Sequence, residues 1–151
     1  MLDDIQIPII TNYINTYRNK HYSPSLVYDS NISIISDAYA KLLGSLKKND
    51  NSISKTYGEN IILFYNINTN DPINLIEKAI DLWYNEKKYY NFNNNNGTEQ
   101  TKHFTTLIWK NSTNYGIGYY YNAKDQLAVI VLNTYPISNI FNTYNDNIQN
   151  I

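Results

Sequence analysis

The spacing of apolar residues predicts amphipathic helices in the first third of the chain. Pro8 suits the first turn of a helix, and after it apolar and aromatic side chains recur on one helical face over residues 9–21. Asp29 is a good N-cap for a second helix. This helix carries the most regular apolar stripe in the sequence, which consists of Ile32, Ile35, Tyr39, Leu42, Leu43 and Leu46.

A polar loop and a short apolar run separate the second helix from a third. Residues 47–58 are polar and rich in Asn, Asp, Ser and Gly, which indicates a loop. The apolar run at 61–65 fits either a strand or a buried helical turn, since its length alone does not decide between them. Asp71 as N-cap and Pro72 at the first helical position predict a helix that runs to Glu86.

The second half of the chain predicts strands. Residues 103–110 alternate from side to side and are rich in β-branched and aromatic residues, so they are expected to form a buried strand that begins at His103. An Asn-rich turn at 93–97 precedes it. Residues 115–122 and 127–135 predict further strands, joined by connections short enough for antiparallel hairpins. Helices followed by a meander of strands indicate an α+β fold with helices packed on a mostly antiparallel sheet.

Length and charge narrow the class of protein. At 151 residues the whole chain, 1–151, is expected to form a single domain. A net charge of −1 gives no sign of the excess positive charge that is typical of proteins that bind nucleic acid or an anionic membrane. The absence of cysteine excludes disulfides, a thiolate nucleophile and a Cys-based zinc site. No signal peptide and no apolar run long enough to span a membrane are visible, so an intracellular setting is favoured.

Several blocks of sequence resemble the CAP superfamily, which includes the cysteine-rich secretory proteins, antigen 5 and pathogenesis-related protein 1. The blocks occur in the family's order: Tyr-Gly-Glu-Asn-Ile at 57–61, Trp-Tyr-Asn-Glu and the residues after it at 83–92, His-Phe-Thr-Thr-Leu-Ile-Trp at 103–109, and Gly-Ile-Gly at 116–118. Residues 15–26 also resemble the first helix of the family, and residues 135–139 its closing motif. The resemblance covers about residues 9–140.

This resemblance implies an α-β-α sandwich with a central cleft lined by two histidines and two glutamates. Glu59, Glu86 and His103 match three of these four positions. The second family histidine has no counterpart, because the loop where it should lie offers only Lys48, Asn49, Asp50 or Asn51. Lys102 and Ser138 stand where the family usually has glycine. Family members are mostly secreted, in contrast to the setting that the missing cysteines and leader favour.

A single imidazole changes the expected metal chemistry. Zinc prefers three or four nitrogen, sulfur or oxygen ligands, and His103 with one or both carboxylates is a poor set for it. The same set would hold Mg²⁺ or Ca²⁺ only weakly. We therefore expect no cofactor, with zinc or another divalent cation at His103 as the weaker alternative.

Each of the three cleft residues also has a structural interpretation. Glu59 could bridge backbone amides after Gly58, Glu86 could be solvated beside two lysines, and His103 could be a hydrogen-bonded core histidine. The family blocks favour the interpretation in which all three line one cleft.

The leading functional hypothesis is a non-enzymatic CAP-type module that binds a sterol, another lipid or a partner protein. The aromatic side chains expected to face a lipid are Tyr57, Phe64, Tyr65, Tyr89, Tyr90 and Phe92. The alternative is a hydrolase in which Glu59, Glu86 and His103 act with water or a divalent metal. A third hypothesis is a structural or host-interaction protein that recruits a partner through surface tyrosines, and a homodimer is compatible with it.

Overall fold

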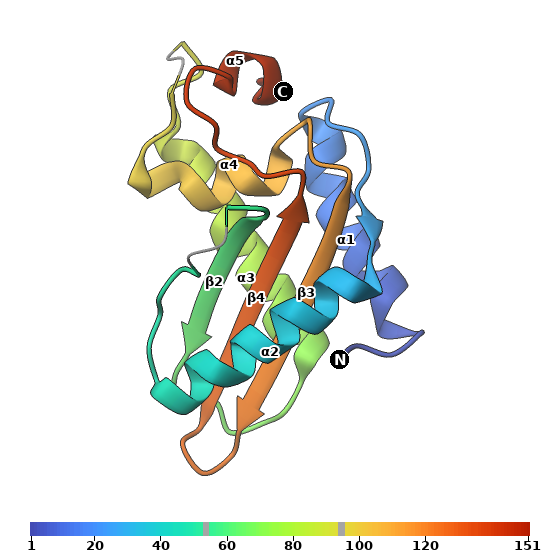
Figure 1. The fold of residues 1–151 in the computed structure, drawn as a ribbon, viewed down its shortest axis with the longest axis vertical. Coiled ribbons are helices and arrows are strands. Elements are labelled where there is room, and N and C mark those ends of the chain that lie inside the picture. The colour runs from blue at the N-terminus through green and yellow to red at the C-terminus, as the bar shows by residue number, and fades with distance from the viewer. Residues whose placement is uncertain (53–54, 94–95) are drawn as a thin grey trace.

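The computed structural model describes residues 1–52, 55–93 and 96–151, which form three layers (Figure 1). Helix α2 (Ser30–Leu46) covers one face of a four-stranded sheet, and α1 (Gln6–Lys20) and α3 (Pro72–Asn85) cover the other. The strands lie in the order β1-β3-β4-β2, with bounds β1 Val27–Tyr28, β2 Gly58–Phe64, β3 Asn114–Asn122 and β4 Leu127–Tyr135. The expected α-β-α sandwich is confirmed.

The sheet is mostly antiparallel, as the sequence predicts. β4 pairs antiparallel with both β2 and β3, while the short β1 is parallel to β3. Alternate residues of β4 fill the two cores. Ala128, Ile130 and Leu132 belong to the larger core on the α1 and α3 side, and Leu127, Val129 and Val131 to the smaller core under α2. The apolar run at 61–65 therefore lies in a strand, β2, through residue 64.

Helix α2 packs unusually close to β3. A methyl group at Gly116 would collide with the backbone of α2 at Ile32 and Ser33, and one at Gly118 would collide with Ser36. Small residues of the helix lie at or near these contacts, and the residues that it buries include Ser33, Ser36, Ala40 and Gly44. The close contact therefore decides which face of α2 is turned inward.

The apolar stripe predicted for this helix is only partly right. Asp29 caps the helix as expected, and Ile32 and Leu43 are buried. Ile35, Leu42 and Leu46, however, remain 48%, 50% and 61% exposed. The helix is thus apolar on its outer face as well, because small residues take up much of its buried face and several of its large apolar residues remain exposed.

The segment predicted as a strand at 103–110 is instead helix α4 (Lys102–Ile108). Contacts from other elements hold both of its ends. Glu86 accepts the backbone N–H groups of His103 and Phe104 in its first turn, at 2.9 and 3.0 Å. Its last carbonyls accept hydrogen bonds from Arg18. These tertiary contacts override the β-propensity of the threonines and isoleucine within the segment.

Arg18 is fully buried and pairs with carbonyl oxygens instead of a carboxylate. Its Nη1 donates to Leu107 and Trp109, each at 3.0 Å. Its Nε donates to Pro24 at 2.9 Å, and its Nη2 to Ser112 at 3.1 Å. Burial lowers the pKa of the guanidinium to about 10. One side chain therefore joins α1, the turn that follows it and the end of α4.

The remaining boundaries differ from expectation by small amounts. Helix α1 begins at Gln6, before Pro8, and ends at Lys20. Short helices occupy Glu86–Tyr89 (η1), Glu99–Thr101 (η2) and, in the predicted irregular tail, Tyr144–Asn147 (α5). Parts of the predicted loop at 47–58 and of the Asn-rich turn, residues 53–54 and 94–95, lie outside the described residues. Within the described part of the chain, no helix has the length and apolar character needed to cross a membrane.

His21, which closes α1, is buried as a neutral imidazole. Its Nδ1 lies 2.7 Å from the backbone oxygen of Gln149, so Nδ1 must carry the proton. Its Nε2 therefore accepts from the hydroxyl of Tyr84 at 2.8 Å. Burial among the rings of Tyr84, Phe92 and Phe104 lowers the pKa of His21 from its ordinary 6.5.

This buried imidazole predicts a pH dependence of stability. The unfolded chain takes up a proton at His21 before the folded chain does, so the free energy of unfolding should fall as the pH drops below about 6.5. We expect the stability difference between wild type and His21→Gln, measured by urea unfolding, to be largest above that pH and to shrink below it. A difference that stays constant between about pH 8 and pH 5 would contradict a neutral buried His21.

Candidate functional site

The structure brings Glu86 and His103 together. His103 Nδ1 donates to Glu86 Oε2 across 2.7 Å, and the other carboxylate oxygen accepts the two backbone N–H groups of α4. Because a carboxylate only accepts, Nδ1 of His103 carries a proton. Both side chains are about one-fifth exposed. Glu86 is therefore not a solvated charge at a helix end, but the residue that anchors α4.

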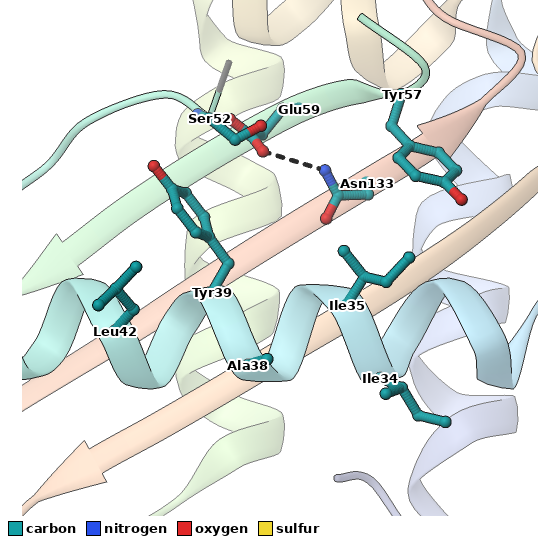
Figure 2. Close-up of a pocket in the computed structure, with 9 residues that line it drawn as sticks. All are labelled: Ile34, Ile35, Ala38, Tyr39, Leu42, Ser52, Tyr57, Glu59 and Asn133. Atoms are coloured by element: carbon teal, nitrogen blue, oxygen red, sulfur yellow. Dashed lines mark hydrogen bonds between the residues drawn. The ribbon is translucent and has the colours of Figure 1, made fainter. Parts of the chain in front are cut away.

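Glu59 lies on strand β2, and its side chain is on the α2 side of the sheet. Its Oε1 accepts the backbone N–H of Ser52 at 2.7 Å, and its Oε2 accepts from Asn133 Nδ2 at 3.3 Å (Figure 2). Asn133 in turn accepts from Ser36 of α2 at 2.7 Å, which places this network on the α2 side. Across residues 1–52, 55–93 and 96–151, no three His, Asp or Glu side chains are grouped so that they could hold a metal ion. Glu59 thus does not complete a set with Glu86 and His103.

The donor atoms on hand do not fit a zinc ion. Zinc requires three or four ligands around one point, each at about 2.0–2.3 Å. His103 offers a single ring nitrogen, since its Nδ1 is bonded to Glu86. Both oxygens of Glu86 already accept protein hydrogen bonds.

A groove of about 520 Å³ opens beside Glu59, between α2 and the start of β2 (Figure 2). We call it the α2 groove. Its wall on the helix side is formed by the exposed apolar residues of α2, and its other side by polar groups near β2. The residues that line it are Ile34, Ile35, Ala38, Tyr39, Leu42, Ser52, Tyr57, Glu59 and Asn133. Its volume lies within the range of about 300–1,000 Å³ that is usual for small-molecule sites.

Of the six aromatic residues predicted to face a lipid, Tyr57 lines the α2 groove. The other five are buried in the core (Phe64, Tyr90), packed against it (Phe92) or exposed outside the groove (Tyr65, Tyr89). Phe64 and Tyr90 are therefore not lipid-facing, because β2 and the chain after η1 turn them into the larger core. The rings of Tyr90, Phe92 and Phe104 pack together there.

The model of the cysteine-rich secretory protein family, CAP, matches residues 11–134. The chain belongs to the CAP family. The match spans the elements from α1 to β4, and with them Glu59, Glu86 and His103.

Relatives and solved structures agree with this assignment. The human Golgi-associated plant pathogenesis-related protein 1 is 32% identical over 131 residues, which cover 85% of this chain and 80% of that protein. The yeast protein PRY2 of Saccharomyces cerevisiae is 27% identical over 93 residues, so the chain matches 26% of its length. Venom allergen-like protein 4 of Schistosoma mansoni shares the fold with a TM-score of 0.68 at 21% identity, covering 92% of each chain.

A solved structure described as NaASP2 with Zn²⁺ also shares the CAP fold. Its TM-score is 0.75 at 17% identity, covering 93% of this chain and 84% of that one. At that identity the likeness concerns the fold alone. The metal chemistry of this CAP chain depends on its own donor atoms, those of His103 and Glu86.

A smaller polar cavity of about 170 Å³ adjoins the α2 groove in this CAP protein. The two cavities share Ser52, Tyr57 and Glu59 in their linings. Lys102 and Ser138, which the resemblance places at positions where glycine is usual, both line the polar cavity. Each adds a hydrogen-bond donor that glycine lacks. Glu86 and His103 are not among the residues that line either of these two cavities.

Residue patterns in the sequence did not single out the apolar wall of the α2 groove. Ile35 and Leu42 were assigned to the core face of their helix, and Ile34 fell outside the predicted stripe. A second stripe of small residues, Ser33, Ser36, Ala40 and Gly44, was the available signal. A helix with a small-residue face can pack closely on a glycine-bearing strand, and this leaves its larger apolar residues to solvent.

Proposed function

We propose that this CAP chain is a non-enzymatic binding module that takes a lipid or sterol in the α2 groove. The observation that carries the proposal is the outward apolar face of α2, where Ile35 and Leu42 are about half exposed beside a cavity of about 520 Å³. A large cluster of exposed apolar side chains is typical of a binding site, whereas single exposed apolar residues are common on any protein surface. A ligand that covers them gains roughly 25 cal/mol per Å² of apolar area removed from water.

The geometry supports binding better than hydrolysis. The Glu86–His103 pair holds an imidazole in a fixed orientation, as a general base requires. A hydrolase built on the three predicted residues would also need Glu59 next to that imidazole. Glu59 instead lies on the α2 side with Asn133, and Glu86 is occupied by the backbone of α4. We therefore propose that the Glu86–His103 pair has a structural role and that the ligand binds in the α2 groove.

We also propose an intracellular setting. The human relative is named for an association with the Golgi, and this chain has no cysteine that an oxidising compartment would pair. Metal binding at His103 is proposed to be weak or absent, because its donor set is incomplete.

Two leucines of α2 offer a matched test of the groove. Leu42 lines it and Leu46 does not, yet both are at least half exposed on the same helix. We expect Leu42→Asn to weaken saturable binding of a fluorescent sterol or fatty alcohol about tenfold, since a half-buried leucine contributes about 1–1.5 kcal/mol to apolar contact. Leu46→Asn should bind like wild type. Equal effects of the two substitutions, or no saturable uptake by wild type, would overturn the proposal.

A further inference from the structure

The carboxylate of Glu59 lies at the polar side of the α2 groove and has no ion-pair partner among the described residues. The groups that donate to it, the Ser52 amide and the Asn133 side chain, are both neutral. Within the part of the chain that the structure describes, no lysine, arginine or histidine forms an ion pair with it. A half-buried carboxylate beside apolar walls is stabilised by an opposite charge, which a bound cation can supply.

Two aromatic rings border the same place. Tyr39 from α2 and Tyr57 from the chain before β2 both line the groove, and in the view of Figure 2 the Glu59 carboxylate lies between them. The hydroxyl of Tyr39 donates to the backbone oxygen of Asp50 at 2.7 Å, which helps to fix its ring. Aromatic faces attract alkylammonium and quaternary ammonium groups. A carboxylate together with such rings is a recognition site for these cations.

The negative field at this end of the groove also acts on Tyr39. Burial, followed by the charges of Glu59 and Asp50, raises the pKa of its hydroxyl. A negative field that disfavours phenolate also disfavours a carboxylate head group placed beside Glu59 and Tyr39. A fatty-acid carboxylate is therefore a poor match for this site.

We infer that the α2 groove takes an amphiphile whose head group carries an ammonium, which pairs with Glu59 between Tyr39 and Tyr57 while the apolar body lies along α2. This inference rests on the proposed function and adds the chemical class of the head group. It follows from the shared lining of Glu59 with the apolar residues Ile35 and Leu42.

The ammonium could belong to a simple alkylammonium or to a zwitterionic phospholipid. The polar cavity on the other side of Glu59 contains Lys102, whose ammonium lies 3.0 Å from Glu99. The Glu99 side chain is 90% exposed, so this ion pair is weak and a phosphate could replace it. The Thr106 and Ser138 hydroxyls, which bond each other at 2.7 Å, line the same cavity.

The test compares four probes of equal chain length below their micellar concentrations, with calorimetry as the readout. The probes are dodecyltrimethylammonium, dodecylphosphocholine, dodecanol and dodecanoate. We expect the two ammonium probes to bind about tenfold more tightly than dodecanol, and dodecanoate to bind most weakly. In Glu59→Gln this preference should fall to roughly twofold or less.

Glu77→Gln is the matched control, because Glu77 is a half-buried glutamate on α3, across the sheet from the groove. It removes the same charge and should leave the preference intact. Lys102→Gln distinguishes the two sources: a loss confined to dodecylphosphocholine indicates a zwitterionic head, and no loss indicates a simple ammonium.

The outcomes separate this inference from the proposed function. If all four probes bind equally in wild type, or if Glu59→Gln keeps the ammonium preference, the head-group inference is wrong and the apolar groove stands. If dodecanol and the ammonium probes all fail to bind, the proposed function itself is wrong and the inference falls with it.

Discussion

Arg18→Met is expected to lower the free energy of unfolding by about 3–5 kcal/mol, the largest effect that the structure predicts for one substitution. Methionine fills much of the same volume but donates no hydrogen bond. The carbonyls of Pro24, Leu107, Trp109 and Ser112 would then be left without the partner that now satisfies them. Two of these four belong to the end of α4, so the helix that carries His103 should loosen first.

Arg18→Lys tests whether the shape or the charge of the guanidinium is responsible for its contribution to stability. Lysine keeps the positive charge near the end of α4, but its single ammonium cannot reproduce a planar fork aimed at four carbonyls. We expect it to recover about half of the loss. Lys20→Met, on the same helix at an exposed position, is the control and should change stability by less than about 0.5 kcal/mol in urea unfolding. Full stability of Arg18→Lys would contradict the account of the fork.

Glu86→Gln is expected to lower the free energy of unfolding by about 2–3 kcal/mol. The neutral amide weakens the charge-assisted bond to His103 Nδ1 and the two backbone bonds at the start of α4. The amide also turns an NH₂ group toward one of these donors. Glu59→Gln is the matched comparison, since Glu59 anchors no helix end, and it should change stability by less than about 1 kcal/mol.

Amide hydrogen exchange locates the effect of Glu86→Gln. Exchange at His103 and Phe104 should accelerate more than exchange in the middle of β4, because the loss begins at the first turn of α4. The hydrolase hypothesis requires the opposite result, in which Glu86→Gln removes an activity and leaves stability nearly unchanged. A variant as stable as wild type would therefore argue against the anchoring role of Glu86.

Local patterns predicted those elements whose signals lie within the element itself. Asp29 and Asp71 were assigned as N-caps, and each side chain accepts a backbone N–H of its helix, from Asn31 at 2.8 Å and from Asn74 at 3.2 Å. Strands β3 and β4 followed from their β-branched and aromatic runs. The order of the family blocks then supplied the three-layer arrangement, which no periodicity could have given.

The two errors concern elements whose conformation or orientation is set from a distance. Residues 103–110 have the composition of a strand, but Glu86 and Arg18 hold the ends of a helix there, from positions 17 and 89 residues away along the chain. The exposed face of α2 differs from the prediction because the helix backbone at Ile32, Ser33 and Ser36 packs directly on Gly116 and Gly118 of a later strand. The contacts that make 103–110 a helix come from outside that segment, whereas the small residues of α2 were a signal within the helix itself.

In the candidate site, too, some features could be predicted from the sequence and others could not. Glu86 and His103 were matched through family blocks and lie in direct contact. Glu59 was expected beside them, but side chains alternate along β2. Its neighbour Asn60 points toward α4 and donates to the backbone oxygen of His103 at 2.9 Å. Glu59 therefore points to the α2 side, where it pairs with Asn133 across the strands.

The central claim is that the α2 groove, and not the Glu86–His103 pair, is where this protein binds its ligand. The most direct test is a titration of isotope-labelled protein with dodecanol, followed by amide chemical shifts. The account predicts saturable shifts concentrated at Ile35, Leu42 and Tyr57. Shifts concentrated at Glu86 and His103, or none that saturate, would contradict it.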